Sequence, residues 1–142
     1  MKTKIFTLVS ALALLAASHA FSQCDPFTPS FSVNLTGSPD SIWISPPVTR
    51  NGYCCTAAGA DVCIEFIITI DPNSNGVSFD VASGAMPVGA LYYQVNCGPQ
   101  IPIGTPICLP GGSTDTITFC KPGNNTNTYI ITSIPLPALS GI

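Results

Sequence analysis

Apolar and polar side chains alternate with a period of two along most of the chain after residue 29, as they do in strands that are buried on one face. Clusters of proline, glycine, asparagine and serine separate these segments and are typical of turns. The chain has 14 prolines and 12 glycines, which interrupt it too often for long helices. The strand-like segments are SFSVNL, SIWIS, VCIEFIITI, GVSFDVA, ALYYQVN, DTITFC and NTYIITSI.

These segments amount to about seven short strands and predict an all-β fold, an antiparallel β-sandwich of immunoglobulin-like type. We expect the sandwich to occupy residues 23–134, followed by a linker-like end at residues 135–142, where proline and serine recur. Glu65 falls on the strand face opposite Ile64 and Phe66, where a solvated charge is expected. The side chains predicted for the core are Ile64, Phe66, Ile68, Phe79, Val81, Phe119 and Ile131.

The first 22 residues have the pattern of a secretory signal peptide. Lys2 and Lys4 precede an uncharged apolar stretch of 13 residues, 5–17, and Ala20-Phe21-Ser22 forms a small-x-small cleavage site. A retained membrane anchor is the alternative, but 13 helical residues rise only about 20 Å, against a hydrocarbon core of about 30 Å. The sequence therefore predicts Sec export to the periplasm or outer cell surface, with no membrane insertion of the mature chain.

Cleavage changes the charge and the chemistry of the chain. It removes Lys2, Lys4 and the single histidine, His19, so that two basic residues face seven acidic ones, a net charge of −5. Such a chain has no basic stripe for phosphates, which excludes nucleic acid as a partner. A protein or a glycan at the cell surface remains. Without histidine, and with its carboxylates scattered, the mature chain is predicted to be neither an enzyme nor a binder of a cofactor.

The seven cysteines all lie after the leader, and an exported chain favours disulfides for them. Structural zinc takes four Cys or His ligands at short paired spacings, and no C-x-x-C or mature histidine is present. We expect three disulfides and one odd cysteine. Spacing favours Cys54 or Cys55 with Cys63, a bridge between Cys97 and Cys108, and Cys24 as the odd one. The disulfide candidates are Cys24, Cys54, Cys55, Cys63, Cys97, Cys108 and Cys120.

The stretch DPNSNG, residues 71–76, matches the first half of a calcium loop, with Asp71, Asn73 and Asn75 as candidate ligands. The bidentate acid of such a loop belongs at its twelfth position, which is Ala82. The alternative is a plain turn between two strands, built by proline, asparagine and glycine. The missing acid favours the turn.

Two aromatic side chains are candidates for sugar stacking. Tyr92 falls on the strand face opposite Leu91, Tyr93 and Val95, so we expect it to be exposed. Trp43 alternates with isoleucines in SIWIS, and a core position is the preferred interpretation for it. A carbohydrate-binding role would use these two aromatics.

The chain from residue 63 to 135, with the Cys54-Cys55 pair, carries a family resemblance. Its most telling parts are SGAMPVGALYYQVNCG, PICL and TFCKPGNNTNTYIITSIP. It resembles the N-terminal cysteine-bearing module of large secreted cell-surface proteins of Bacteroidota. In proteins of that family, the module is followed by immunoglobulin-like or PKD-like repeats and then by a gliding-motility-associated sorting domain for type IX secretion. The resemblance implies the same arrangement for a longer protein that contains this chain. No catalytic residues are implied.

The linker-like C-terminus and the lack of catalytic groups favour a non-catalytic structural or adhesive module. Carbohydrate binding through exposed aromatics, a frequent role of secreted sandwiches, is the alternative. No sorting domain follows in this sequence, so the chain is either part of a longer protein or a short relative. Ser41 and Thr116 follow aspartates in Asp-Ser-Ile and Asp-Thr-Ile, which resemble the O-glycosylation signal of exported Bacteroidota proteins. The alternative interpretation is that each aspartate starts a strand. In both interpretations we expect these hydroxyls to be exposed.

Overall fold

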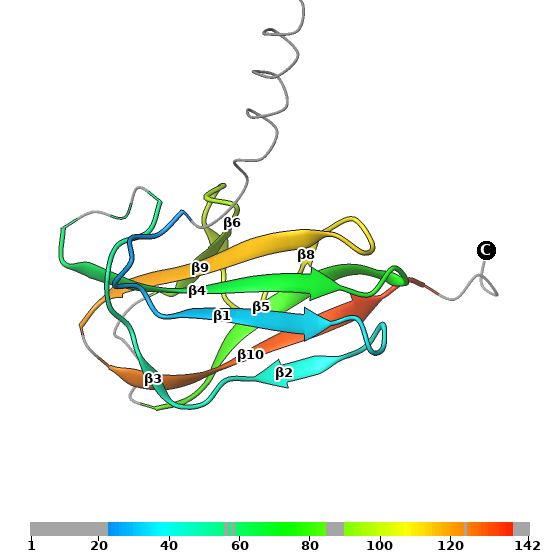
Figure 1. Ribbon diagram of the computed structural model, residues 1–142, viewed down its shortest axis with the longest axis horizontal. Coiled ribbons are helices and arrows are strands. Elements are labelled where there is room, and N and C mark those ends of the chain that lie inside the picture. Colours follow the sequence, from blue (N-terminus) through cyan, green and yellow to red (C-terminus); the bar gives the residue numbers. More distant parts are fainter. Residues whose placement is uncertain (1–22, 56, 58, 85–89, 124, 138–142) are drawn as a thin grey trace, which may run out of the picture.

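The computed structural model describes residues 23–55, 57, 59–84, 90–123 and 125–137, which form two β-sheets (Figure 1). The predicted leader and residues 138–142 lie outside this range. The described residues are all strand, turn and loop, and none of them forms a helix suited to crossing a membrane. The strands are β1 Ser30–Leu35, β2 Ile42–Ile44, β3 Val48–Thr49, β4 Asp61–Ile70, β5 Ser74–Gly84, β6 Tyr92–Val95, β7 Ile101–Pro102, β8 Ile107–Cys108, β9 Thr114–Pro122 and β10 Thr126–Pro135.

The two sheets face each other across one apolar core. The first has the strand order β1-β4-β9-β6-β7, and the second has the order β2-β10-β5-β8, with β3 also paired to β10. Aromatic rings join the sheets: Phe66 on β4 lies 5.6 Å from the ring of Phe79 on β5 and 5.6 Å from that of Tyr129 on β10. All seven side chains predicted for the core are buried, with exposed fractions of 9% or less.

Two features of the fold differ from the sequence prediction. β1 pairs with β4 in parallel, from Ser30 opposite Glu65 to Leu35 opposite Ile70, so the first sheet is mixed and not antiparallel throughout. After β1 the chain crosses to the other sheet to form β2 and β3, and it returns to start β4 at the end where β1 starts. In addition, β3, β7 and β8 were not predicted, because two residues are too short to show a period of two.

β10 also runs further than the sequence boundary suggested. Pro135, expected to begin the linker, still pairs with Ser74, and the backbone amide of Leu136 donates to the carbonyl of Asn73. The strand therefore takes in the first residue of the segment that was predicted to be linker-like.

Arg50 closes one end of the core with a buried guanidinium that is 1% exposed. Its Nη1 donates to Asn127 Oδ1 at 3.1 Å and to the Tyr129 hydroxyl at 3.3 Å, and its Nη2 donates to the Gly123 carbonyl at 2.9 Å. The guanidinium carbon lies 5.3 Å from the centre of the Phe119 ring, a cation–π arrangement. This cation is thus held by neutral oxygens and an aromatic face.

Because Tyr93 and Tyr129 are buried, we expect the free energy of unfolding to fall at alkaline pH. Burial raises the pKa of Tyr93 above 10.0, and burial also raises the pKa of Tyr129 although the hydrogen bond and charge of Arg50 act to lower it. Above about pH 10 the unfolded chain releases these protons and the folded chain keeps them, so the free energy of unfolding decreases as pH rises. Urea denaturation at about pH 9 and about pH 11 measures the decrease.

Tyr93→Phe is the control for this prediction, because it keeps the ring and lacks the titrating proton. The variant should lose less stability than the parent chain between the two pH values. Equal losses in both proteins would show that Tyr93 does not contribute to the alkaline transition.

Candidate functional site

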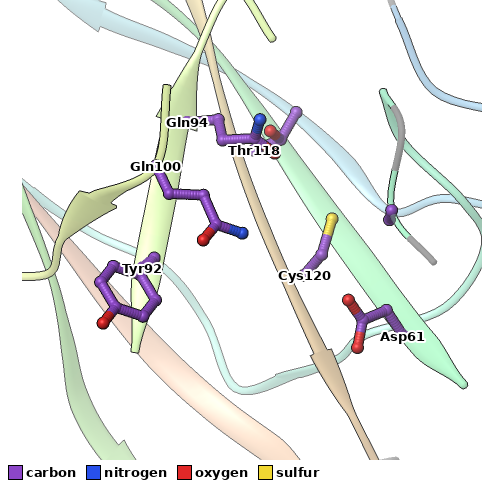
Figure 2. A pocket seen from close by; sticks show the side chains of 7 residues that line it. Asp61, Tyr92, Gln94, Gln100, Thr118 and Cys120 are labelled. Atoms are coloured by element: carbon purple, nitrogen blue, oxygen red, sulfur yellow. The ribbon is translucent and has the colours of Figure 1, made fainter. Parts of the chain in front are cut away.

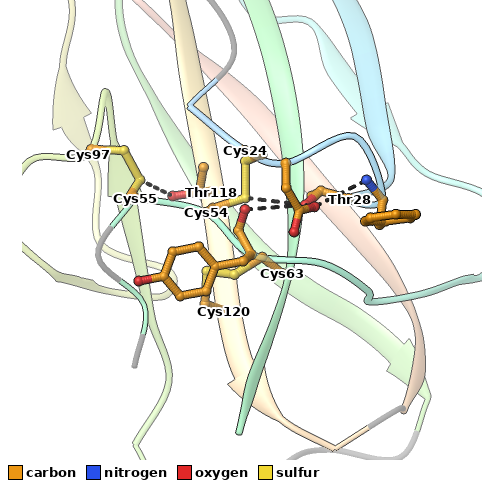
Figure 3. Close-up of a disulfide and its surroundings, with 11 residues drawn as sticks. Cys24, Thr28, Cys54, Cys55, Cys63, Cys97, Thr118 and Cys120 are labelled. Atoms are coloured by element: carbon orange, nitrogen blue, oxygen red, sulfur yellow. Dashed lines mark hydrogen bonds between the residues drawn. A yellow bond between two sulfur atoms is a disulfide. The ribbon is translucent and has the colours of Figure 1, made fainter. Parts of the chain in front are cut away.

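Three disulfides lie around the β4–β9 strand pair (Figure 3): Cys24–Cys54, Cys55–Cys97 and Cys63–Cys120. Cys108 is free and exposed. The predicted number, three bridges and one odd cysteine, is confirmed. The predicted pairings are wrong: Cys63 bonds neither Cys54 nor Cys55, Cys97 does not bond Cys108, and Cys24 is not the odd cysteine. Three bridges fit a non-reducing environment.

Strand register, and not closeness in sequence, sets these pairings. Cys63 on β4 lies directly opposite Cys120 on β9, and their Cα atoms are 4.1 Å apart. Cys108 lies on β8 in the other sheet, whereas Cys97 follows β6 in the first sheet, so these two cannot close the loop between them. Register between distant strands is not encoded in cysteine spacing.

The N-terminal segment and the described part of the loop before β4 form a clamp, residues 23–29, 50–55, 57, 59 and 60, on the outer face of the first sheet. The backbone amide of Asp25 donates to the carbonyl of Tyr53, the amide of Cys55 to that of Gln23, and the amide of Cys63 to that of Gly52. Partial desolvation acts to raise the pKa of Asp25, but hydrogen bonds, first that from the Thr28 hydroxyl, lower it below 3.8.

The prediction of a solvated charge at Glu65 is wrong. Its side chain lies on the outer face as the pattern indicates, but it is 3% exposed and not solvated. The backbone amide of Glu65 donates to the carbonyl of Pro29, which brings the N-terminal segment over β4. Alternation identified the face, but it could not show that the side chain on that face is buried.

The turn after β6 is held in an unusual backbone conformation by its disulfide. Asn96 and Cys97 have φ of 51° and 54°, and the amide of Gly98 donates to the carbonyl of Val95. Two successive residues in the left-handed region define a tight turn. Asparagine adopts this backbone conformation more readily than most residues, whereas cysteine adopts it rarely. Cys55, at the other end of the bridge, has φ of 55°. The Cys55–Cys97 bridge therefore joins the clamp to this turn.

A groove of about 190 Å³ opens beside the clamp on the outer face of the first sheet (Figure 2). It is lined by strands β4, β6 and β9, by the loop before β7 and by the clamp. Most of its lining atoms are polar. The lining residues are Ala57, Asp61, Tyr92, Gln94, Gln100, Thr118 and Cys120.

Tyr92 provides the aromatic surface of this groove. It is 40% exposed, whereas its neighbour Tyr93 is fully buried, so the predicted orientation is confirmed. Gln94 Nε2 donates to the Gly98 carbonyl at 2.8 Å, which fixes that side chain. In Figure 2 the amide of Gln100 and the carboxylate of Asp61 extend toward the space between them. The groove thus places the Tyr92 ring near one fixed amide, that of Gln94, and near the Gln100 amide and the Asp61 carboxylate.

Sequence reasoning found one of these groove residues and missed the others. Asp61, Gln94, Gln100 and Thr118 come from three strands and a loop, and they share no motif. Trp43, the other aromatic candidate, is half-buried: its ring lies 5.8 Å from that of Phe31 and 5.7 Å from that of Phe66. The core interpretation of Trp43 agrees with this packing, which leaves Tyr92 as the candidate platform.

The candidate calcium residues form a turn between β4 and β5. Asp71 Oδ1 accepts a hydrogen bond from the amide of Asn73 at 2.8 Å, and the Asp71 carbonyl accepts one from the amide of Ser74. The carbonyl of Asn75 accepts from the amide of Leu109. Within the described chain, Asp71 belongs to no group of three acidic or cysteine ligands. These contacts support the turn interpretation.

The two candidate glycosylation hydroxyls differ in exposure. Thr116 is 8% exposed, and its backbone amide donates to Asn96 Oδ1, so the expectation of an exposed hydroxyl there is wrong. The reason is that the turn after β6 folds against β9. Ser41 is half-buried and its hydroxyl donates to the carbonyl of Ser38. Glycosylation of Ser41 stays a prediction.

Comparison of the chain with protein-family models, with curated proteins and with solved structures gave no match.

Proposed function

We propose that this chain is a non-catalytic adhesive module of an exported cell-surface protein, and that it contacts glycans through the groove at Tyr92. We assign the module an immunoglobulin-like β-sandwich fold. In support, β4 pairs with β9 in one sheet and β5 pairs with β10 in the other, with aromatic side chains packed between them. A structural role without a ligand is the simpler form of the same proposal.

The disulfide clamp supports the extracellular part of the proposal. Cys24–Cys54 joins the N-terminal segment to the loop before β4, Cys55–Cys97 joins that loop to the turn after β6, and Cys63–Cys120 joins β4 to β9. Such bridges persist outside the reducing cytoplasm, where they hold surface loops in place. The groove therefore has fixed walls, which lowers the entropy lost when a ligand binds.

The observation that carries the glycan assignment is the combination of Tyr92 with polar neighbours. An exposed ring offers an apolar face to the C–H face of a sugar, and the side chains of Gln94, Gln100 and Asp61 offer hydrogen-bond groups to hydroxyls. Among the described lining residues, Asp61 has the one carboxylate, whereas glycosidases commonly use two carboxylates. The arrangement therefore suits binding better than cleavage.

We expect Tyr92→Ala to lower the affinity for glycan at least about fivefold, because removal of an aromatic contact of this kind costs about 1 kcal/mol or more. A glycan array with the parent chain first identifies the ligand, and calorimetry with that ligand then measures the change. Tyr53→Ala is the matched control, since Tyr53 is 48% exposed and lies outside the groove lining.

Equal losses in the two tyrosine variants would show that binding does not use the groove. No retention of the parent chain on any glycan would refute the glycan assignment and leave the structural role. Both variants change exposed side chains, so their folding is checked by the fluorescence of the single tryptophan, Trp43.

A further inference from the structure

Two neighbouring disulfides, Cys24–Cys54 and Cys63–Cys120, make up a sulfur cluster at the clamp. The sulfur atoms of Cys54, Cys63 and Cys120 lie within 4.8 Å of one another, and that of Cys24 is bonded to Cys54. These residues come from the N-terminal segment, the clamp loop, β4 and β9. A tetrahedral zinc site with four thiolates has Zn–S bonds of about 2.3 Å, which places its sulfurs about 3.8 Å apart. Three of the four sulfurs are thus close to this spacing, and the Cys24 sulfur, which lies outside the group of three, has to move on reduction to become the fourth ligand.

We propose that the thiol form of the protein binds one Zn²⁺ ion through Cys24, Cys54, Cys63 and Cys120. The same four cysteines then close the clamp in two alternative ways, by two disulfides or by one metal ion. The absence of a C-x-x-C motif does not oppose this assignment, because the strand register and the clamp bring the ligands together.

The backbone holds both cysteine pairs without help from the sulfur–sulfur bonds. Cys63 and Cys120 are opposite each other in the β4–β9 ladder, which extends from Asp61 to Thr69. Cys24 and Cys54 form a β-bridge of their own. Reduction therefore separates each pair of sulfurs to van der Waals distance while the ladder and the bridge keep the four thiols near one another.

The cluster is enclosed on one side and accessible on the other. Cys54 and Cys63 are fully buried, so bulk water does not compete for their sulfurs. Cys120 is half-buried and lines the groove beside Asp61, which provides a path for an ion or a reductant. The third bridge, Cys55–Cys97, is not part of the cluster.

Reduction with zinc binding, and oxidation with zinc release, each conserve electrons and protons. Two equivalents of a phosphine reductant supply four electrons, and four protons from water convert the two disulfides to four thiols. Binding of Zn²⁺ displaces the thiol protons to solvent, so that affinity rises with pH. Oxidation by a small-molecule disulfide removes four electrons, restores the two bridges and releases the ion.

Cobalt titration tests the proposal on the full mature chain carrying Cys108→Ala, which removes the exposed free thiol. After reduction with a phosphine and anaerobic desalting, Co²⁺ should bind at one equivalent per chain. We expect visible d–d bands of a tetrahedral ion and thiolate-to-cobalt charge-transfer bands, both abolished by Zn²⁺. Cys55→Ala/Cys97→Ala should retain this spectrum, and Cys24→Ala/Cys54→Ala should weaken Co²⁺ binding at least about tenfold.

Undiminished Co²⁺ binding in Cys24→Ala/Cys54→Ala would overturn the assignment of the ligands. Circular dichroism follows the fold in parallel. If the reduced chain unfolds, addition of Zn²⁺ should refold it, as it does for domains that are folded only with metal. A reduced chain that shows no charge-transfer band, whether folded or unfolded, would overturn the proposal as a whole.

Discussion

Replacing Cys63 and Cys120 together by alanine is expected to lower the free energy of unfolding by about 4 kcal/mol. The bridge joins residues 57 positions apart, the widest separation among the three disulfides, so its loss releases the most conformational entropy in the unfolded chain. The folded chain changes less, because the β4–β9 ladder pairs the two residues in any case. Urea denaturation followed by Trp43 fluorescence measures the loss.

Cys108→Ala is the matched control for this experiment, since it removes a cysteine that is exposed and unbridged. We expect its effect to stay within about 0.5 kcal/mol. A loss below about 1 kcal/mol in the Cys63/Cys120 variant would contradict a closed bridge between these strands. Cys55→Ala/Cys97→Ala provides a further comparison, with a shorter loop of 42 positions.

The strands could be predicted from the sequence, but the pairing of one strand with another could not. Alternation predicted β1 with its observed bounds, and it placed Phe66 and Phe79 in the core, because the period of two is a local property. The parallel pairing of β1 with β4 depends on a crossover through the second sheet, which no local pattern encodes. The same limit explains the cysteines: their number implied three bridges, but Cys63 meets Cys120 only through strand register.

The candidate site was predictable to a smaller extent. Tyr92 could be found because alternation shows which face of a strand it occupies. Gln94, Gln100 and Thr118 could not, since they become neighbours of Tyr92 only when β6, β9 and the loop before β7 come together. Glu65 shows another limit, because alternation gave the strand face that it occupies but not its burial on that face.

Arg50→Ala is expected to destabilise the fold by about 3 kcal/mol, although Arg50 forms no ion pair with a described residue. The substitution leaves the buried Tyr129 hydroxyl without this donor, removes the contact with the Gly123 carbonyl at the surface, and removes the side chain that packs on Phe119. The alternative is that the buried guanidinium destabilises the fold on balance, because removing its charge from water costs free energy.

Arg50→Met separates these two views, since methionine keeps most of the apolar stem and lacks the charge and the donors. If the hydrogen bonds stabilise the fold, the methionine variant should lose about 1 to 2 kcal/mol, less than the alanine variant. If desolvation dominates, it should be as stable as the parent chain or more so. Lys121→Ala is the control, because the Lys121 ammonium makes an exposed contact with the Ala90 carbonyl, and we expect a change within about 0.5 kcal/mol. We expect the first outcome, since three neutral oxygens and the Phe119 ring contact the guanidinium, although its buried Nε has no hydrogen-bond partner among the described residues.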